Sequence, residues 1–234
     1  ILLPPFQRGD FTPVQRRWYF LAIATGVIAI LLSQSRAAYG ILVWAVWLFA
    51  TNERKAHPRI HLRNVAFMGV LAAMLLASSA WLPSDPLRLR LAWNEVLTAE
   101  QDGNYKTSMG ARVYVWALAR KGIQESPWIG VGGRERLRRL REAGAELPDP
   151  QRAQLAVVRK LGHVHNQYLH SAMDGGLIGL TSTLAVLAGL GAAAFALRRT
   201  DPMASRQMQG VLLLHATAGL TNVNLAHNYY AVML

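Results

Sequence analysis

Apolar residues are gathered into long blocks in this chain, and this distribution constrains its fold more than any other feature. The blocks cover residues 18–32, 37–50, 64–82, 177–197 and 208–225, and the charged residues are concentrated between them. A helix needs roughly 20 apolar residues to cross a bilayer, and the last three blocks reach that length. The pattern predicts an all-α polytopic membrane protein.

The basic residues between the blocks predict how the spans are oriented, because Lys and Arg in short loops stay on the cytoplasmic side. The short basic loops are residues 15–17, 52–63 and 198–206. One helix over residues 18–50 would be about 50 Å long against a hydrocarbon core of about 30 Å, and would separate the first two loops. Two short spans joined at Ser33-Gln34-Ser35-Arg36 keep every loop inside. We therefore expect about five spans in this chain, with Arg36 at the outer end of two of them.

Three parts follow from this topology. Residues 1–82 form transmembrane helices with cytoplasmic basic loops, residues 83–165 form a large outer loop with amphipathic helices, and residues 166–234 form further transmembrane helices. The outer loop carries 14 Lys and Arg against 9 Asp and Glu. Loops longer than about 60 residues are largely exempt from the orientation rule. A basic face outside the membrane indicates anionic lipid or phosphate as its partner.

Net charge and cysteine content exclude several classes. A net charge of +12 would favour nucleic acid as partner of a soluble protein, but membrane lipids explain it better here, and we expect no nucleic acid. The chain has no cysteine, which excludes disulfides, iron–sulfur clusters and a thiol nucleophile. It begins with Ile1-Leu2-Leu3-Pro4-Pro5 and ends in an apolar stretch, so we expect further residues at both ends.

Two helices are predicted inside the outer loop. Residues 109–124 indicate an amphipathic helix that ends at Ser126-Pro127. Residues 134–142 indicate a second, arginine-dense helix, followed by a turn near residues 148–150. The segment Gly130-Val131-Gly132-Gly133 has no preceding strand and lacks the glycine spacing of a nucleotide loop, so we interpret it as a turn. In the first helix, the residues at helical spacing are Val113, Trp116, Ala117 and Arg120.

The densest polar cluster, residues 162–168 (Gly-His-Val-His-Asn-Gln-Tyr), directly precedes the fourth apolar block. Asn166 is a predicted N-cap, which places His165 at a helix start on the outer membrane face. A helix N-terminus attracts phosphate and disfavours imidazolium, and a neutral imidazole is what a general base requires. The alternative is that His163 and His165 are interfacial residues that form hydrogen bonds. A metal site is disfavoured, because no Asp-x-Asp or Glu-x-x-His partner completes a ligand set.

Arginines are the second kind of candidate. Arg36 is an ionisable residue at the membrane end of two helices, which is by default a functional hypothesis. Its alternative is snorkelling to lipid headgroups. Arg112 is a third candidate, with a solvated or headgroup-facing position as its alternative. We interpret the arginines of residues 134–141 as a solvated face that could also meet acidic lipid.

Taken together, these segments resemble the conserved region of the O-antigen ligase and polymerase superfamily. His165-Asn166, followed after nine residues by Gly176-Leu177-Ile178-Gly179, matches the histidine signature of that superfamily. Ser35-Arg36-Ala37-Ala38-Tyr39-Gly40 resembles its Ser-Arg motif. Arg112-Val113-Tyr114-Val115-Trp116 resembles its Arg-x-x-x-Trp motif, and Ser126-Pro127-Trp128-Ile129-Gly130-Val131-Gly132 its Pro-x-x-Gly-x-Gly segment.

The resemblance implies a GT-C glycosyltransferase that needs neither metal nor cofactor. It would act on an undecaprenyl-pyrophosphate-linked glycan at the periplasmic face of the bacterial inner membrane. Arg36 and Arg112 would hold the pyrophosphate, His165 would activate the acceptor hydroxyl, and His163 and Asn166 would support it. The resemblance covers residues 18–197, and superfamily members have more spans, so this chain corresponds to the C-terminal part of a larger helical bundle.

The acceptor is not fixed by these residues. The basic outer loop favours a ligase with lipid A–core oligosaccharide as acceptor. The alternatives within the superfamily are an O-antigen polymerase and a protein O-oligosaccharyltransferase. An alternative of another class is a transporter or flippase for the lipid-linked glycan. Transporters carry polar interruptions near the midplane of several spans, whereas the polar cluster here lies at one side, which favours chemistry at a surface.

Overall fold

The computed structural model describes residues 89–223 and Leu225, together with some residues between Thr12 and Thr25. Arg36, the predicted spans at 37–50 and 64–82 and most of the span at 18–32 lie outside the described residues. The chain divides into two compact units. Leu89–Val186 and Ala218–Leu234 form one, called the central unit below, and Ile1–Arg88 and Leu187–Thr217 form the other. Each unit is described by itself.

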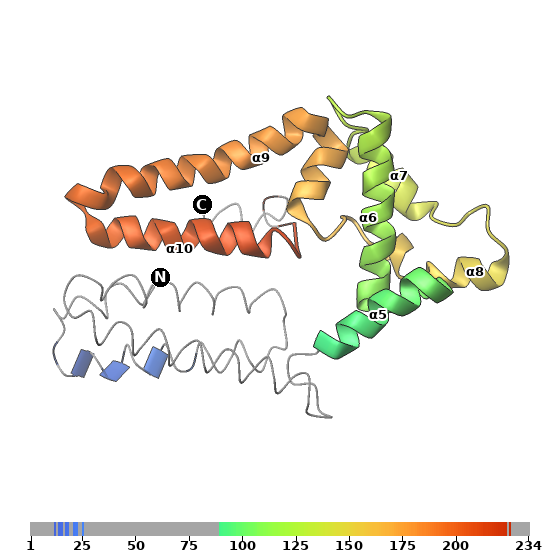
Figure 1. The fold of residues 1–234 in the computed structure, drawn as a ribbon, viewed down its shortest axis with the longest axis horizontal. Coiled ribbons are helices and arrows are strands. Elements are labelled where there is room, and N and C mark those ends of the chain that lie inside the picture. Colours follow the sequence, from blue (N-terminus) through green and yellow to red (C-terminus); the bar gives the residue numbers. More distant parts are fainter. Residues whose placement is uncertain are drawn as a thin grey trace. The chain divides into compact units, whose positions relative to one another are not determined.

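All regular elements of the described residues are helices, as predicted (Figure 1). They are α5 (Leu89–Asp102), α6 (Ser108–Glu125), α7 (Gly133–Arg141), α8 (Asp149–Gln154), the short 3₁₀-helix η2 (Val158–Lys160), α9 (Gln167–Thr200) and α10 (Pro202–Ala218).

Helix α6 is the scaffold of the central unit. It begins where the Thr107 side chain accepts a hydrogen bond from the Gly110 amide, and it ends at Ser126, as predicted. Its buried face carries Ala111, Val115 and Ala119, which lie four residues apart and so share one side of the helix. The buried face differs from the set singled out from the sequence, because two members of that set, Ala117 and Arg120, are exposed. This face packs in the same buried cluster as Val158 of η2.

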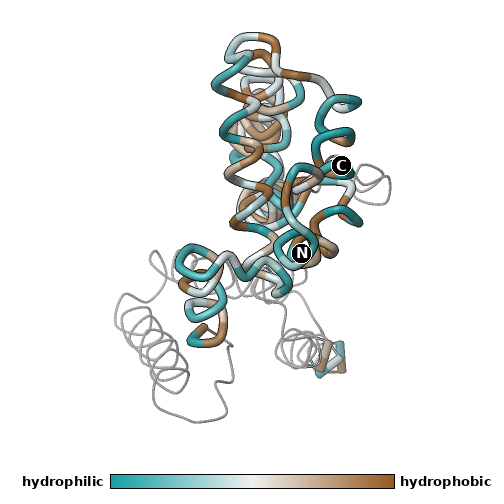
Figure 2. Tube along the Cα trace, turned by 90° about the vertical axis from the view of Figure 1, so that its right-hand side faces the viewer, coloured by the Kyte–Doolittle hydropathy of each residue, from teal (hydrophilic) through white to brown (hydrophobic). Residues whose placement is uncertain are grey.

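The core of the central unit brings together residues that are far apart in the sequence. Hydrophilic and hydrophobic residues alternate along much of the chain (Figure 2). Val164, in the predicted polar cluster, is fully buried in this core, and so is Met173 of α9. The polar cluster is therefore anchored from within. The buried set is Ala111, Val115, Ala119, Leu140, Ala143, Leu155, Val158, Val164 and Met173.

Helices α7 and α8 follow the predicted order with one correction. α7 covers Gly133–Arg141, within one residue of the prediction. The turn predicted at residues 148–150 is instead the start of α8, where Pro148 is the N-cap and Pro150 lies in the first turn. A proline there removes no helical hydrogen bond, because the first N–H groups of a helix have no partner inside it.

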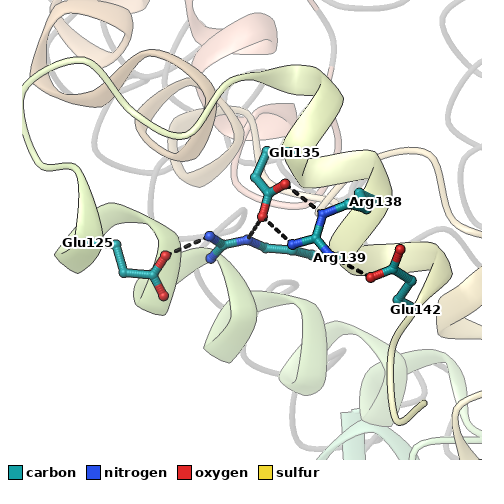
Figure 3. A network of polar contacts seen from close by, with 5 residues as sticks. All are labelled: Glu125, Glu135, Arg138, Arg139 and Glu142. Carbon is teal, nitrogen blue, oxygen red and sulfur yellow. Dashed lines mark hydrogen bonds and ion pairs between the residues drawn. The ribbon is translucent and has the colours of Figure 1, made fainter. Parts of the chain in front are cut away.

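Two of the α7 arginines take part in a surface network rather than a purely solvated face (Figure 3). Arg138 pairs with Glu135 at 2.7 Å and with Glu142, and Arg139 pairs with Glu135 at 2.8 Å and with Glu125 of α6 at 2.6 Å. The network joins the C-terminal end of α6 to α7. Hydrogen bonds from Arg138 and then Arg139 lower the pKa of Glu135 from 4.5 to about 2.

This network predicts a pH-dependent stability. Because the folded pKa of Glu135 lies below its unfolded value, its stabilising contribution is present above about pH 4.5 and is lost as the pH falls towards 2. We expect Glu135→Gln to lower the unfolding temperature slightly at pH 7, since surface ion pairs contribute little, and by less at pH 2.5. The measurement is thermal unfolding at both pH values, with exposed Glu146→Gln as the matched control. If Glu135→Gln lowers the unfolding temperature equally at both pH values, the result contradicts the prediction.

Helix α9 contains the fourth apolar block and is broken at Gly176, where φ is 59° and ψ is −147°. The part after the break coincides with the span predicted at residues 177–197. Among the described residues, α9 is the one helix whose length and composition suit it to cross a membrane. The remaining spans stay predictions.

Helix α10 corrects the prediction for the fifth block. Asp201 Oδ1 accepts hydrogen bonds from the amides of Met203 and Ala204 at 3.1 and 3.0 Å, so the helix begins at Pro202. It ends at Ala218, and the predicted bounds of 208–225 are wrong at both ends. The prediction of a basic loop over residues 198–206 is also wrong. α9 and α10 are joined at Asp201 alone, and Arg198, Arg199 and Arg206 lie in the ends of these two helices. Ser205 Oγ donates to the Ala194 carbonyl at 2.6 Å, which ties the two helices together.

Candidate functional site

The segment from Gly162 to Asn166 forms a tight turn between η2 and α9, called the His turn below. His165 has a φ of 53°, in the left-handed region that costs a non-glycine residue of order 1 kcal/mol or more unless the surroundings impose it. Its amide donates to Nδ1 of His163 at 3.3 Å, and the two rings meet edge to face with centroids 4.2 Å apart. The two histidines therefore form a pair, although they share no helix face.

Side chains from α6 and α7 hold the His turn on both sides of His163. The Trp116 indole Nε1 donates to the Val164 carbonyl at 3.0 Å. Arg136 Nη1 donates to the Gly162 carbonyl. Since the Val164 side chain is also buried in the core, the backbone that carries His165 is fixed at three points. This explains how the chain maintains an unfavourable φ at that residue.

Asn166 begins α9, as the sequence predicts. Its Oδ1 accepts a hydrogen bond from the Leu169 amide at 3.0 Å, which is N-capping geometry. Its Nδ2 donates to the Leu220 carbonyl at 3.1 Å, and the Gln167 amide donates to the Gly219 carbonyl at 2.7 Å. The start of α9 is therefore tied to the segment that follows α10.

We expect Asn166→Ala to lower the free energy of unfolding by about 1–2 kcal/mol, because it removes both the cap and a bond to a backbone carbonyl. Asn166→Ser should retain most of the stability, since a serine hydroxyl also caps a helix. Thermal unfolding of the purified protein measures both. Equal stability of the alanine variant and the wild type would show that the cap contributes nothing.

The break in α9 is joined to the Pro-x-x-Gly-x-Gly segment by four backbone hydrogen bonds. A helix interrupted at Gly176 loses partners for two carbonyls before the break and two amides after it. The carbonyls of Met173 and Asp174 accept from the amides of Val131 and Gly132 at 2.8 and 3.1 Å. The amides of Leu177 and Ile178 donate to the carbonyls of Pro127 and Trp128 at 2.8 and 3.3 Å. All four groups are thereby satisfied.

The glycines of both motifs are required by this close approach. A Cβ at Gly176 would lie 2.3 Å from the Trp128 carbonyl carbon, and one at Gly130 would lie 2.5 Å from the Asp174 carbonyl carbon. Both glycines also have positive φ, of 59° and 69°. A Cβ at Gly179 would lie 2.3 Å from the Ser171 carbonyl oxygen. The Gly-x-x-Gly signature therefore sets the shape of α9 beside the His turn.

Arg112 lies on α6 one turn before Trp116 and is half-buried, with Nη1 3.8 Å from Met109 Sδ. Residues four apart on a helix share a face, so Arg112 is on the side of α6 whose tryptophan contacts the His turn. The structure thus brings three of the four predicted motifs together: the Arg-x-x-x-Trp motif, the histidine signature and the Pro-x-x-Gly-x-Gly segment. Arg36 lies outside the described residues, and the roles of all three residues stay predictions.

A partly buried ion pair beside the His turn was not predicted from the sequence. Arg136 Nε donates to Asp174 Oδ1 at 2.8 Å, and Arg136 is only 8% exposed. The solvated face assigned to residues 134–141 is therefore wrong for Arg136. Two signals were available: Arg136 lies four residues before buried Leu140, and Asp174 is the only acidic residue in positions 150–200.

Within residues 89–223, no three His, Asp or Glu side chains lie together as a potential metal site. The candidate site of the described chain consists instead of two histidines, a helix-capping asparagine, a half-buried arginine and a partly buried ion pair. A polar turn held at the start of an apolar helix defines the class: a helical membrane protein with a polar site beside one span.

Comparison with known proteins agrees with this class. A model of the O-antigen ligase family matches residues 21–184, and the chain belongs to that family, as the motifs predict. The match includes α6, the His turn and the break in α9. An uncharacterised protein of Haemophilus influenzae is 25% identical over 172 residues, which are 72% of this chain and 41% of that protein. The chain thus spans less than half the length of this relative.

Proposed function

We propose that this chain is part of an inner-membrane glycosyltransferase of the GT-C kind. It transfers O-antigen polysaccharide from undecaprenyl pyrophosphate to a hydroxyl of lipid A–core oligosaccharide, with its site on the periplasmic side. Family membership supports the enzyme class. The catalytic assignment rests on the backbone of His165, which is the one non-glycine residue of the described chain with a positive φ. Such strain persists where the surroundings impose it, and it is concentrated at functional sites.

In the proposed reaction His165 is the general base. The acceptor O–H gives its proton to the imidazole, and the oxygen forms a bond to the anomeric carbon of the donor sugar. The bond from that carbon to the pyrophosphate oxygen breaks, and the pyrophosphate leaves with the electron pair. Attack from the face opposite the leaving group inverts the anomeric configuration. A general base must be uncharged before the transfer, so His165 acts as the neutral imidazole.

Arg112 and Arg36 bind the leaving group in this proposal. Two guanidinium groups neutralise the charge that develops on pyrophosphate, so no metal ion is required. Arg112 lies on the α6 face that contacts the His turn through Trp116, which supports its assignment. The two lipid-anchored substrates meet in the plane of the membrane, and their positioning supplies much of the remaining acceleration.

The choice of lipid A–core as acceptor rests on the surface charge of the central unit. Exposed basic side chains on α6, α7, α8 and η2 suit the phosphates of lipid A. They are Arg120, Lys121, Arg134, Arg141, Arg152 and Lys160.

The experiment that tests the proposal uses the complete purified protein in lipid nanodiscs with lipid-linked glycan as donor. Lipid A–core, a second lipid-linked repeat and a pilin peptide are offered separately. We expect product on lipid A–core. Product only on the lipid-linked repeat indicates a polymerase, and product only on peptide indicates a protein O-oligosaccharyltransferase. Movement of the donor across the bilayer without any product overturns the enzymatic assignment in favour of transport.

A further inference from the structure

Arg136 differs from its neighbours in the arginine-dense helix α7. Arg134, Arg138 and Arg141 are exposed, whereas Arg136 is 8% exposed and lies on the same face as buried Leu140. A guanidinium is rarely buried unless its donors are satisfied. The acceptors of Arg136 therefore indicate its structural role.

The guanidinium of Arg136 connects two segments that are separate in the sequence. Nε donates to Asp174 Oδ1 at 2.8 Å, and Nη1 donates to the Gly162 carbonyl at the start of the His turn. Asp174 lies two residues before the break in α9, and its other carboxylate oxygen is 3.5 Å from His170 Nε2. One planar group thus links the turn that carries His165 to the helix whose N-terminus follows it.

The surroundings leave little freedom to this bridge. The Asp174 backbone carbonyl accepts from the Gly132 amide at 3.1 Å, so α7 and α9 are also joined beside the ion pair. A Cβ at Gly133 would lie 3.1 Å from Asp174 Oδ2 and 3.5 Å from Arg136 Nη2. Nε and Nη1 of Arg136 are bonded to Asp174 and Gly162, and the side chain is buried, so these contacts assign the guanidinium to the protein's own backbone and carboxylate.

We propose that Arg136 is a positioning residue for His165, acting with Asp174 as its anchor. The inference rests on the proposed role of His165 as general base. Trp116 holds the turn from the Val164 carbonyl and Arg136 holds it from the Gly162 carbonyl, so the two side chains fix the backbone on either side of His163. Lysine cannot replace Arg136 fully, because an ammonium lacks the planar fork that bonds a carboxylate and a carbonyl in fixed directions.

The experiment combines a kinetic and a structural readout on the complete protein in nanodiscs. The variants are Arg136→Ala, Arg136→Lys and Asp174→Asn. Exposed Arg138→Ala on the same helix is the matched control, because its ion pairs with Glu135 and Glu142 do not reach the His turn. Hydrogen–deuterium exchange is followed in peptides that cover residues 162–170. We expect faster exchange there in Arg136→Ala and Asp174→Asn. The control should resemble the wild type.

Kinetics distinguish positioning from general stability. A displacement of about 1 Å at a reacting group can cost about 10²-fold in rate. We expect Arg136→Ala to lower kcat to that extent with KM for the donor unchanged, and Arg136→Lys to fall between it and the wild type. Should Arg136→Ala fail to fold, Asp174→Asn, which keeps the shape of the side chain and removes its charge, provides the same test.

Each outcome bears on one proposal. Unchanged exchange at residues 162–170 in both Arg136→Ala and Asp174→Asn overturns the positioning role, whatever the activity. Faster exchange with wild-type kcat overturns it as well, because the turn would then be loosened without effect on the reaction. Full transfer by a His165 variant overturns the proposed function instead, and leaves the exchange result to show that Arg136 holds the turn.

Discussion

Replacing His165 is expected to lower the rate of glycosyl transfer by about 10²–10⁴-fold, the usual contribution of a general base. Binding of the lipid-linked donor should be unchanged, because the proposed pyrophosphate ligands are arginines on other segments. The measurement is a single-turnover transfer assay, with donor affinity determined separately from a fluorescent analogue. Full transfer without the imidazole would turn the interpretation towards transport or binding.

The left-handed φ of 53° at His165 complicates a simple alanine substitution. Alanine carries a strain at this φ that asparagine tolerates better. His165→Asn therefore removes the base with less strain on the turn, and it should lose transfer as fully as His165→Ala while unfolding at a temperature closer to that of the wild type. If the asparagine variant retains activity, the alanine variant loses transfer because of backbone strain and not because the imidazole is missing.

Gly176→Ala is expected to be strongly destabilising. The added Cβ would lie 2.3 Å from the Trp128 carbonyl carbon, and φ of 59° is unfavourable for alanine. Strain and overpacking together cost roughly 2–6 kcal/mol. Gly175→Ala is the matched control, because a Cβ there meets no atom within 4 Å. Thermal unfolding of both variants measures the difference, and equal stability of the two would contradict the described packing.

The same contact can be tested from its other side. Gly130→Ala would place a Cβ 2.5 Å from the Asp174 carbonyl carbon. Since both substitutions force apart the same pair of segments, the double variant should lose less stability than the two single losses combined. Residues that share a contact show such coupling, whereas distant and independent sites add. Full additivity would indicate that the two glycines act separately.

The local elements around the site could be predicted from short stretches of the sequence. Helical spacing and the ending at Ser126-Pro127 located α6 to within one residue, and the arginine-dense run located α7 equally well, because such signals are encoded over a few neighbouring positions. Asn166 marked the start of α9 for the same reason. The order of the motifs was also sufficient to predict the family.

Only the tertiary structure decided which faces meet. Arg136 bonds Asp174 across 38 residues, and Trp116 bonds Val164 across 48. Pairings at such separations depend on the packing of the whole unit and leave no local period in the sequence. The buried face of α6, the pairing of Arg136 with Asp174 and the joining of two glycine motifs were therefore visible only in three dimensions.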